Sequence, residues 1–305
     1  MYLEPPVLTN TVPAVTHPRR EEIATFGAVH LEVTDIHRST VFWTKVLGLH
    51  IRTEESDRVQ LGTQDATLVV LHPGAQHAFL PRHSGLYHLA IHPPSETEFA
   101  RILRNLVRAR WRISPVDHIM SKAIYLNDPD GITVEITLET PERLKELVLT
   151  ENSVEATRVD GSRASGRDPF DVHATLALLS DTDVETLVPV GTRIGHVHLH
   201  VGDLMASYQF YRALGFSQAL WAPGLGIGDL GAGGAFNHRI AVNTWQGLNV
   251  PQSPAGTARM RHFSIYFDTH ERLDDVLGKV ENDITETHMG HQINDPAGNN
   301  IVLSA

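Results

Sequence analysis

The chain contains no cysteine among its 305 residues, and this absence removes several kinds of chemistry at once. Disulfides, thiolate nucleophiles, iron–sulfur clusters and zinc-finger sites all require cysteine, so imidazole and carboxylate groups must hold any metal here. The sequence also lacks an apolar run near the ~20 residues that span a membrane, and its N-terminus lacks the basic-then-apolar pattern of a signal peptide. We therefore expect a cytoplasmic protein without a membrane partner.

Basic residues are also scarce. The chain has 25 Lys and Arg against 36 Asp and Glu, which gives a formal net charge of -11. Nucleic-acid binding draws most of its affinity from Lys and Arg that neutralise phosphates, so a nucleic-acid partner is not expected. Small molecules are the expected partners. The 19 His can supply metal ligands.

The segment from residue 116 to 137 brings polar groups of different chemistry around one turn. Asn127 to Gly131 reads NDPDG, in which Pro fixes φ at one central position and Gly permits φ > 0 at another. This pattern predicts a hairpin. Glu135 then lies in the middle of the second strand among polar neighbours, where a carboxylate needs a partner. His118 and Tyr125 precede the turn.

A strand, a helix and three further strands recur along the chain. The unit begins at Phe26, begins again at Leu86, and is repeated from Ile194, where Gly195 and His198 match Gly27 and His30. A fourth copy begins at Arg261 and ends in NDPAGNNIVL, which repeats NDPDGITVEI. A repeat of this length indicates duplication. The sequence therefore predicts an α+β fold of four βαβββ modules paired into two similar domains.

The segments between the modules set the expected domain boundaries. Residues 1–24, rich in Pro, are expected to form an N-terminal arm that orders against another subunit or domain, and we expect a homo-oligomer. Residues 25–140 form the expected N-terminal metal-binding domain of two modules, and residues 191–305 the C-terminal domain. Residues 141–190 lack strand alternation and are expected to be a linker with one helix near Val172 to Leu179.

Three side chains on the polar faces of predicted strands are the expected metal ligands: His30, His88 and Glu135. Each one alone is more simply explained as a hydrogen-bonded core or surface residue. Together they lie on the first strand of module one and on the first and last strands of module two. Two His and one carboxylate form the facial triad associated with non-haem Fe(II) and O₂ chemistry.

These residues resemble the vicinal oxygen chelate superfamily, whose paired βαβββ modules supply His, His and Glu to a divalent metal. The segment DHIMSKAIYLNDPDGITVEI resembles the type I extradiol dioxygenases, and His118, Tyr125, the 128–131 turn and Glu135 match their pattern in order. The resemblance implies ring cleavage of a catechol-type diol by O₂, within the breakdown of aromatic compounds. It implies Fe(II), with Mn(II) as the alternative, and catalytic roles for His118 and Tyr125.

Two features depart from the family pattern. The C-terminal half has Val302 where the ligand Glu stands in the N-terminal half, so its site is expected to be degenerate, although an all-His site remains open. The histidines that would form such a site are His196, His198, His200, His238 and His262. The family's acid–base His before the second ligand is also undecided, since His72 and His77 both precede His88 in loop-like surroundings.

Two other functions are compatible with the same fold, since a fold does not fix chemistry. A glyoxalase-like isomerase or lyase would usually take a fourth protein ligand, and the aligned stretch Ala66 to Leu71 offers no carboxylate. A ligand-sequestering protein would bind in the same cup without metal, which the combination of His30, His88 and Glu135 argues against.

Overall fold

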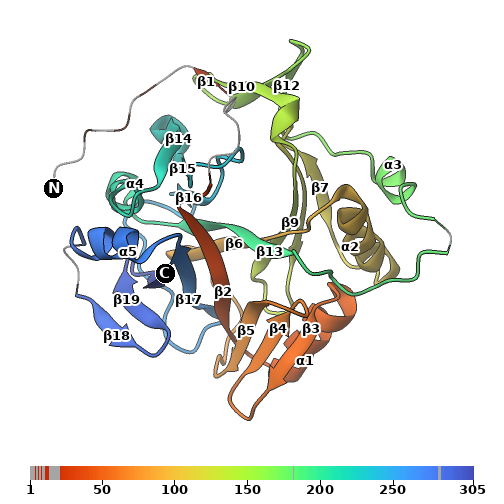
Figure 1. The fold of residues 1–305 in the computed structure, drawn as a ribbon, viewed down its shortest axis with the longest axis horizontal. Helices are drawn as coiled ribbons and strands as arrows, with labels where there is room; N and C mark the ends of the chain where they lie inside the picture. Colours follow the sequence, from red (N-terminus) through yellow and green to blue (C-terminus); the bar gives the residue numbers. More distant parts are fainter. Residues whose placement is uncertain are drawn as a thin grey trace.

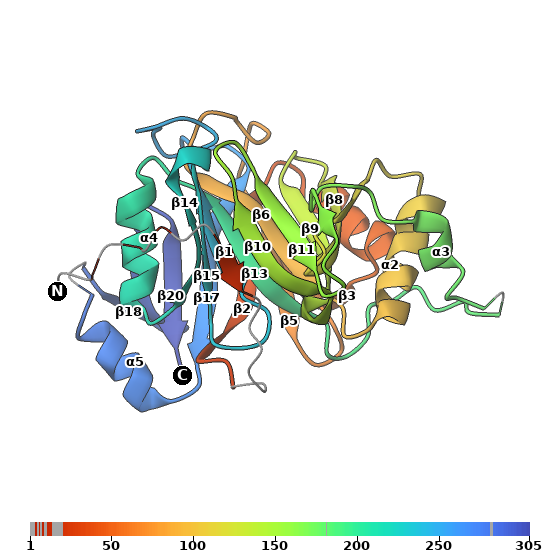
Figure 2. The same cartoon turned by 90° about the horizontal axis from the view of Figure 1, so that it is seen from above.

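A computed structural model describes residues 4, 6, 8, 11–13, 21–180, 182–280 and 283–305 of the chain. The four βαβββ modules follow one another as predicted, and they form two eight-stranded sheets. Figure 2 shows α4 and α5 at one end of the molecule and α2 and α3 at the other, with the sheets between them. No helix in the described ranges is long and apolar enough to cross a membrane.

The first half of the chain contributes modules one and two. Module one consists of β2 (Ala24–Val33), α1 (Ile36–Val41), β3 (His50–Glu54), β4 (Val59–Gly62) and β5 (Thr67–Pro73). Module two consists of β6 (Gly85–His92), α2 (Glu96–Arg108), β7 (Ser114–Asp117), β8 (Ser121–Asn127) and β9 (Thr133–Glu139). A π-helical turn over Phe42–Val46 extends α1.

The second half contributes modules three and four. Module three consists of β13 (Arg193–His200), α4 (Leu204–Ala213), β14 (Ser217–Ala222), β15 (Ile227–Gly231) and β16 (Ile240–Asn243). Module four consists of β17 (Arg259–Phe267), α5 (His270–Leu277), β18 (Thr285–Thr287), β19 (Gly290–Asn294) and β20 (Asn300–Ser304).

The modules pair across the two halves of the chain. One sheet has the order β14-β15-β16-β13-β6-β9-β8-β7 and so joins modules two and three. The other has the order β18-β19-β20-β17-β2-β5-β4-β3 and joins modules one and four. The sequence prediction grouped modules one and two within residues 25–140, and modules three and four within 191–305. The structure instead builds each of its two similar domains from one module of each half (Figure 1).

Antiparallel pairing of first strands makes both junctions. In one sheet β6 pairs with β13, which sets His88 opposite His198. In the other, β2 pairs with β17, which sets His30 opposite His262. The first strands therefore bring histidines of the two halves together at the centre of each sheet.

Alternation along the strands separates the core from the polar face. On β2, Val29, Leu31 and Val33 are fully buried, whereas His30 and Glu32 between them are half-buried. The helices pack against the apolar faces, and α2 begins at Ser95, whose hydroxyl accepts a hydrogen bond from the Glu98 N–H as an N-cap does. Helix α2 buries the side chains predicted for its apolar face, which are Phe99, Ile102, Leu103 and Leu106.

The predicted hairpin forms between β8 and β9. Gly131 has a φ of 86°, the left-handed conformation that the turn requires of its glycine. The Asp128 carboxylate accepts hydrogen bonds from the N–H groups of Asp130 and Ile132, which closes the turn. The resulting register sets Tyr125 directly opposite Glu135.

The segment predicted as a linker contains strands as well as the expected helix. Strands β10 (Leu144–Leu149), β11 (Val154–Arg158) and β12 (Arg163–Ala164) form a small sheet, and α3 spans Val172–Leu176. Strand β1 (Thr11–Pro13) of the arm pairs with β10 of the same chain. Much of the remaining arm lies outside the described residues. A small apolar cluster of Ile119, Leu144 and Ala156 packs this sheet against module two.

Candidate metal centre

Three buried side chains converge where modules two and three meet: His88 from β6, Glu135 from β9 and His196 from β13. His88 Nε2 lies 2.9 Å from Glu135 Oε2. His196 Nε2 lies 3.1 Å from the same oxygen and 3.1 Å from His88 Nε2. The mid-strand carboxylate that the sequence left without a partner therefore has two imidazoles beside it.

Strand geometry explains the convergence. Strands β6 and β9 run parallel, with Ala90 beside Glu135, so His88 and the carboxylate lie two residues apart on one face. Ala90 is also the register partner of His196 across the β6–β13 junction. The small side chain at position 90 thus lies between the carboxylate and the second imidazole, and leaves room for the three donor groups.

The donor atoms fit a divalent cation. Their separations of 2.9, 3.1 and 3.1 Å correspond to one face of an octahedron with bonds of about 2.1 Å, the usual length from a metal to imidazole or carboxylate. Glu135 is 2% exposed. Burial opposes its ionisation, but His196 and His88 hold the pKa of Glu135 well below its ordinary value. An ionised carboxylate and two imidazoles are thus ready to bind a cation.

His198 belongs to a second group of possible ligands in the described part of the chain, with His88 and His238. Its Nε2 accepts a hydrogen bond of 2.8 Å from the Asn243 amide. The opposite end of that amide accepts from the Trp245 N–H at 3.0 Å, which fixes its orientation. The lone pair of His198 Nε2 is therefore already used.

His238, the third member of that group, forms an ion pair of 3.1 Å with Asp229. Burial opposes its charge, yet Asp229 raises the pKa of His238. This group also contains no carboxylate to offset the charge of a divalent cation in a buried site. The group of His88, Glu135 and His196 is the better-suited donor set.

The predicted catalytic pair lies next to this triad. His118 Nδ1 lies 2.7 Å from the Gly166 carbonyl, which can only accept, so this nitrogen carries the proton. Its Nε2 then accepts from the Tyr125 hydroxyl at 3.0 Å. Burial lowers the pKa of His118, and burial together with Glu135 raises that of Tyr125 well above 10. Both groups are neutral and joined by one hydrogen bond.

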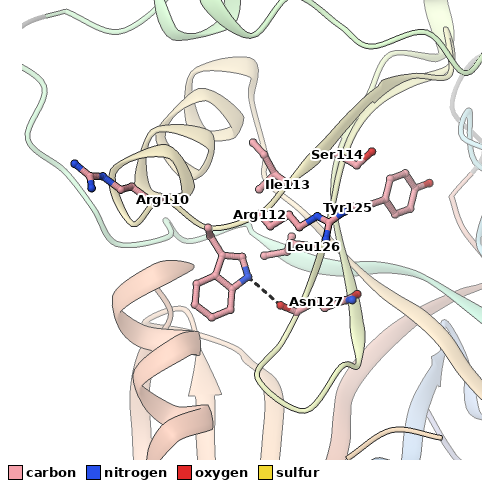
Figure 3. Close-up of a pocket in the computed structure, with 8 residues that line it drawn as sticks. Arg110, Arg112, Ile113, Ser114, Tyr125, Leu126 and Asn127 are labelled. Carbon is pink, nitrogen blue, oxygen red and sulfur yellow. Dashed lines mark hydrogen bonds between the residues drawn. The ribbon is translucent and has the colours of Figure 1, made fainter. Parts of the chain in front are cut away.

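Tyr125 also borders a cavity of about 690 Å³ at the edge of the sheet. Its walls come from residues 110–114, which follow α2, and from the end of β8. The Trp111 indole N–H donates to the Asn127 main-chain carbonyl at 2.9 Å, and this bond ties the loop after α2 to the hairpin. It is the dashed line that ends at Asn127 in Figure 3.

Comparison with known proteins agrees with this architecture. Residues 25–136 match the model of the glyoxalase/bleomycin resistance protein/dioxygenase superfamily. The catechol-2,3-dioxygenase of Bacillus subtilis (strain 168) is 30% identical over 278 residues, which cover 88% of this chain and 93% of that protein. The chain belongs to this superfamily. The resemblance inferred from the sequence is confirmed.

Solved structures of superfamily relatives have the same fold. A candidate dioxygenase from Bacillus subtilis subsp. subtilis superimposes with a TM-score of 0.60 at 12% identity, over 92% of this chain and 85% of that one. Glyoxalase I from Zea mays superimposes with a TM-score of 0.54 at 16% identity, over 92% of both chains. At these identities the likeness concerns the fold alone.

The donor set that the structure brings together differs in one position from the set expected from the sequence. The sequence predicted His30, His88 and Glu135, but His30 lies in the other sheet, because β2 pairs with β17 rather than with β6. Its Nδ1 lies 2.9 Å from His72 Nε2, and its ring stacks on His262 at 3.9 Å between centroids. His196 takes the place predicted for His30.

The other predicted histidines separate between the two sheets. His72, one of the two acid–base alternatives, accompanies His30, and His77 is exposed and forms a backbone bridge to Thr257. His200 donates to the Asn243 carbonyl oxygen at 2.7 Å. Of the C-terminal histidines considered for a separate site, His196 instead completes the site of the N-terminal half.

Sequence reasoning missed three residues behind the triad: His92, Glu139 and Arg239. His92 and Glu139 each follow a triad residue by four positions on its own strand, His88 on β6 and Glu135 on β9. That repeated spacing was the available signal, since period-two alternation puts residues four apart on one face.

Proposed function

We propose that this protein is an extradiol-type dioxygenase that cleaves a catechol-type aromatic diol with O₂ at a metal held by His88, Glu135 and His196. The observation that carries the proposal is the set of three donor atoms within 3.1 Å of one another beside the Tyr125–His118 pair. The 30% identical relative named catechol-2,3-dioxygenase supports it.

The donor set favours Fe(II), with Mn(II) as the alternative, because two imidazoles and one carboxylate form the facial triad of non-haem oxygenases. A metal held by these residues would supply Lewis-acid chemistry for the diol and O₂. The overall reaction adds both oxygen atoms of O₂ to the diol and opens the ring beside its hydroxyl groups.

The protein's own contribution is proton transfer next to the metal. A substrate hydroxyl near Tyr125 can give its proton to the phenol oxygen while the phenol gives its own proton to His118 Nε2. The Gly166 carbonyl, 2.7 Å from His118 Nδ1, holds the imidazole in the orientation that accepts it. A positioned donor of this kind accelerates a reaction about 10²–10⁴-fold.

Aromatic neighbours and exclusion of water also fit an aromatic substrate. The Tyr87 ring lies beside His88, with centroids 4.7 Å apart, and 5.5 Å from the Trp245 ring at a steep angle. Aromatic side chains favour edge and face contacts with an aromatic ring. The triad itself is almost fully buried, so electrostatic interactions there are stronger than in water.

The test is anaerobic reconstitution with Fe(II), followed by addition of catechols in air with an oxygen electrode and absorbance at visible wavelengths. We expect oxygen uptake equal to the diol consumed, with a yellow ring-fission product. His30→Ala is the matched control, since it removes an imidazole from the equivalent strand of the other sheet and should retain activity. Stoichiometric Fe(II) without oxygen uptake on a panel of catechols would reject the proposal and favour isomerase or lyase chemistry.

A further inference from the structure

We propose that His92 and Glu139 are positioning residues that fix which nitrogen of His196 carries the proton, so that its Nε2 is free to bind metal. The inference rests on the metal centre proposed above. It concerns a chain of buried groups behind the triad, which makes no contact with the reacting atoms.

The chain of contacts is continuous. His196 Nδ1 lies 2.9 Å from His92 Nε2, and His92 Nδ1 lies 2.8 Å from Glu139 Oε1. His92 is 3% exposed and His196 is 1% exposed, so water does not compete for the bond between the two rings. Gly195 makes the approach feasible, because a Cβ at that position would lie 2.1 Å from the His92 ring.

Glu139 fixes the direction of every bond in this chain. Arg239 donates to its carboxylate at 2.7 Å and Arg193 at 3.0 Å. Burial opposes its charge, but His92 and Arg239 hold the pKa of Glu139 far below its ordinary value, so the group is a carboxylate. A carboxylate only accepts hydrogen bonds, so His92 Nδ1 must carry a proton.

The donor and acceptor roles of the His92 nitrogens then determine those of the His196 nitrogens. Arg239 and Arg193 already balance the carboxylates of Glu139 and Glu22, so a further positive charge on the buried His92 ring is unfavourable, and a proton on its Nδ1 leaves a lone pair on Nε2. That lone pair must accept from His196 Nδ1–H. His196 is 1% exposed and lies between the rings of His92 and His88, where a second proton is unfavourable, so its Nε2 presents a lone pair to Glu135 and His88.

The result is an arrangement that attracts a cation. His196 Nε2 and Glu135 Oε2 are two lone-pair atoms only 3.1 Å apart. His88 Nε2 lies 2.9 Å from the same Glu135 oxygen and 3.1 Å from His196 Nε2, so in the metal-free protein its proton can lie between them, and a bound metal would take the place of that proton. A divalent ion in the same place would satisfy all three donors. Without the His92 bond, His196 could turn its proton toward Glu135 and compete with the metal.

Ion pairs of Arg239 hold the Glu139 end of this series of hydrogen bonds in place. Arg239 is 2% exposed and also donates to Glu22 at 3.1 Å and to the Gly195 carbonyl at 3.0 Å. Glu22 lies just before β2, so this network ties the module-one strand to β13 and β9. The positioning of His196 thus depends on contacts from three modules.

The test uses Co(II) as the probe, since its visible absorption reports binding to the apo protein without any turnover. We expect His92→Leu to weaken Co(II) binding by about 10–100-fold, the usual cost of losing a hydrogen-bond partner behind a metal ligand. His92→Gln should restore most of the affinity, because its amide can donate to Glu139 and accept from His196. His262→Leu, which removes an imidazole from a central strand of the other sheet, is the control and should bind Co(II) normally.

A measurement on the unmodified protein keeps the inference testable if a variant fails to fold. Long-range ¹H–¹⁵N spectra of the ¹⁵N-histidine-labelled apo protein distinguish the two tautomers, and His196→Gln assigns the signal. We expect His196 to carry its proton on Nδ1. A proton on Nε2 would overturn the inference, as would Co(II) affinity that is unchanged in His92→Leu or equally lost in a folded His92→Gln. Co(II) binding that depends on His92, without oxygen uptake by the Fe(II) protein, would reject only the proposed function.

Discussion

Replacing His196 with alanine is expected to remove the bound metal, whereas the same change at His30 is expected to leave it in place. The donor atoms of His88, Glu135 and His196 are separated by 2.9–3.1 Å, which puts a common centre about 2.1 Å from each. His30 instead bonds to His72 in the other sheet.

The size of the effect follows from the number of donors lost. Without His196, two donor atoms 2.9 Å apart remain, and one face of the coordination shell is open to water. Losing a partner that only orients a ligand costs about 10–100-fold in affinity, so losing the ligand itself should cost more than about 100-fold. The core faces of the strands are untouched, and folding should be preserved.

Metal content after anaerobic Fe(II) loading and desalting is the assay, with circular dichroism to verify folding. His88→Ala and Glu135→Ala should behave as His196→Ala, and His198→Ala should keep its iron. Iron that is retained in His196→Ala but lost in His30→Ala would refute the reasoning from strand pairing, and would restore the ligand set inferred from the sequence alone.

Three further outcomes are expected. Tyr125→Phe and His118→Ala should keep the metal and lower turnover on the order of 10²-fold, and unchanged turnover in both would remove the pair from the site. Iron analysis should find one metal per chain, and His30→Ala/His262→Ala should not reduce it; a fall from two to one would reveal a second site. Burial lowers the pKa of His30 to about 3 and that of His262 to about 4, from 6.5. The unfolded chain therefore binds more protons below pH 6.5, and stability should fall with pH toward 4 by up to ~1.4 kcal/mol per pH unit for each group. Urea midpoints at pH 7 and 5 test this, and an equally steep dependence in the double variant would contradict it.

The sequence predicted the modules and most of the side chains that the structure brings together at the candidate site, because both depend on short-range patterns. Period-two alternation and the NDPDG turn set the β8–β9 hairpin, and with it the register of Tyr125 and Glu135. His88 and Glu135 belong to one module, so a strand–helix–strand connection fixes their relation. The part of the site that lies within residues 85–140 was therefore predictable.

The choice between His30 and His196 depended on which modules pair, and four similar modules can pair in more than one way. The repeat shows that β2 and β13 are equivalent, but it does not show which of them lies beside β6. Long-range strand pairing carries no local signal in the sequence. The repeat also aligned His198 rather than His196 with His30, and only the bulged register of β13 shows which imidazole faces Glu135.

Because modules pair across the two halves of the chain, neither half contains a complete eight-stranded sheet. A fragment ending near residue 140 would contain His88 and Glu135 but not the third donor, His196. It would also expose the hydrogen-bonding edges of β2 and β6, which pair with β17 and β13 in the whole chain. Exposed edges of this length recruit further strands. Because the modules are alike, the available partner for such a fragment is a second fragment, so half of this chain should associate with another half rather than remain single. Residues 141–190 link the two halves covalently. The halves therefore pair within one molecule, whereas separate halves would have to dimerise.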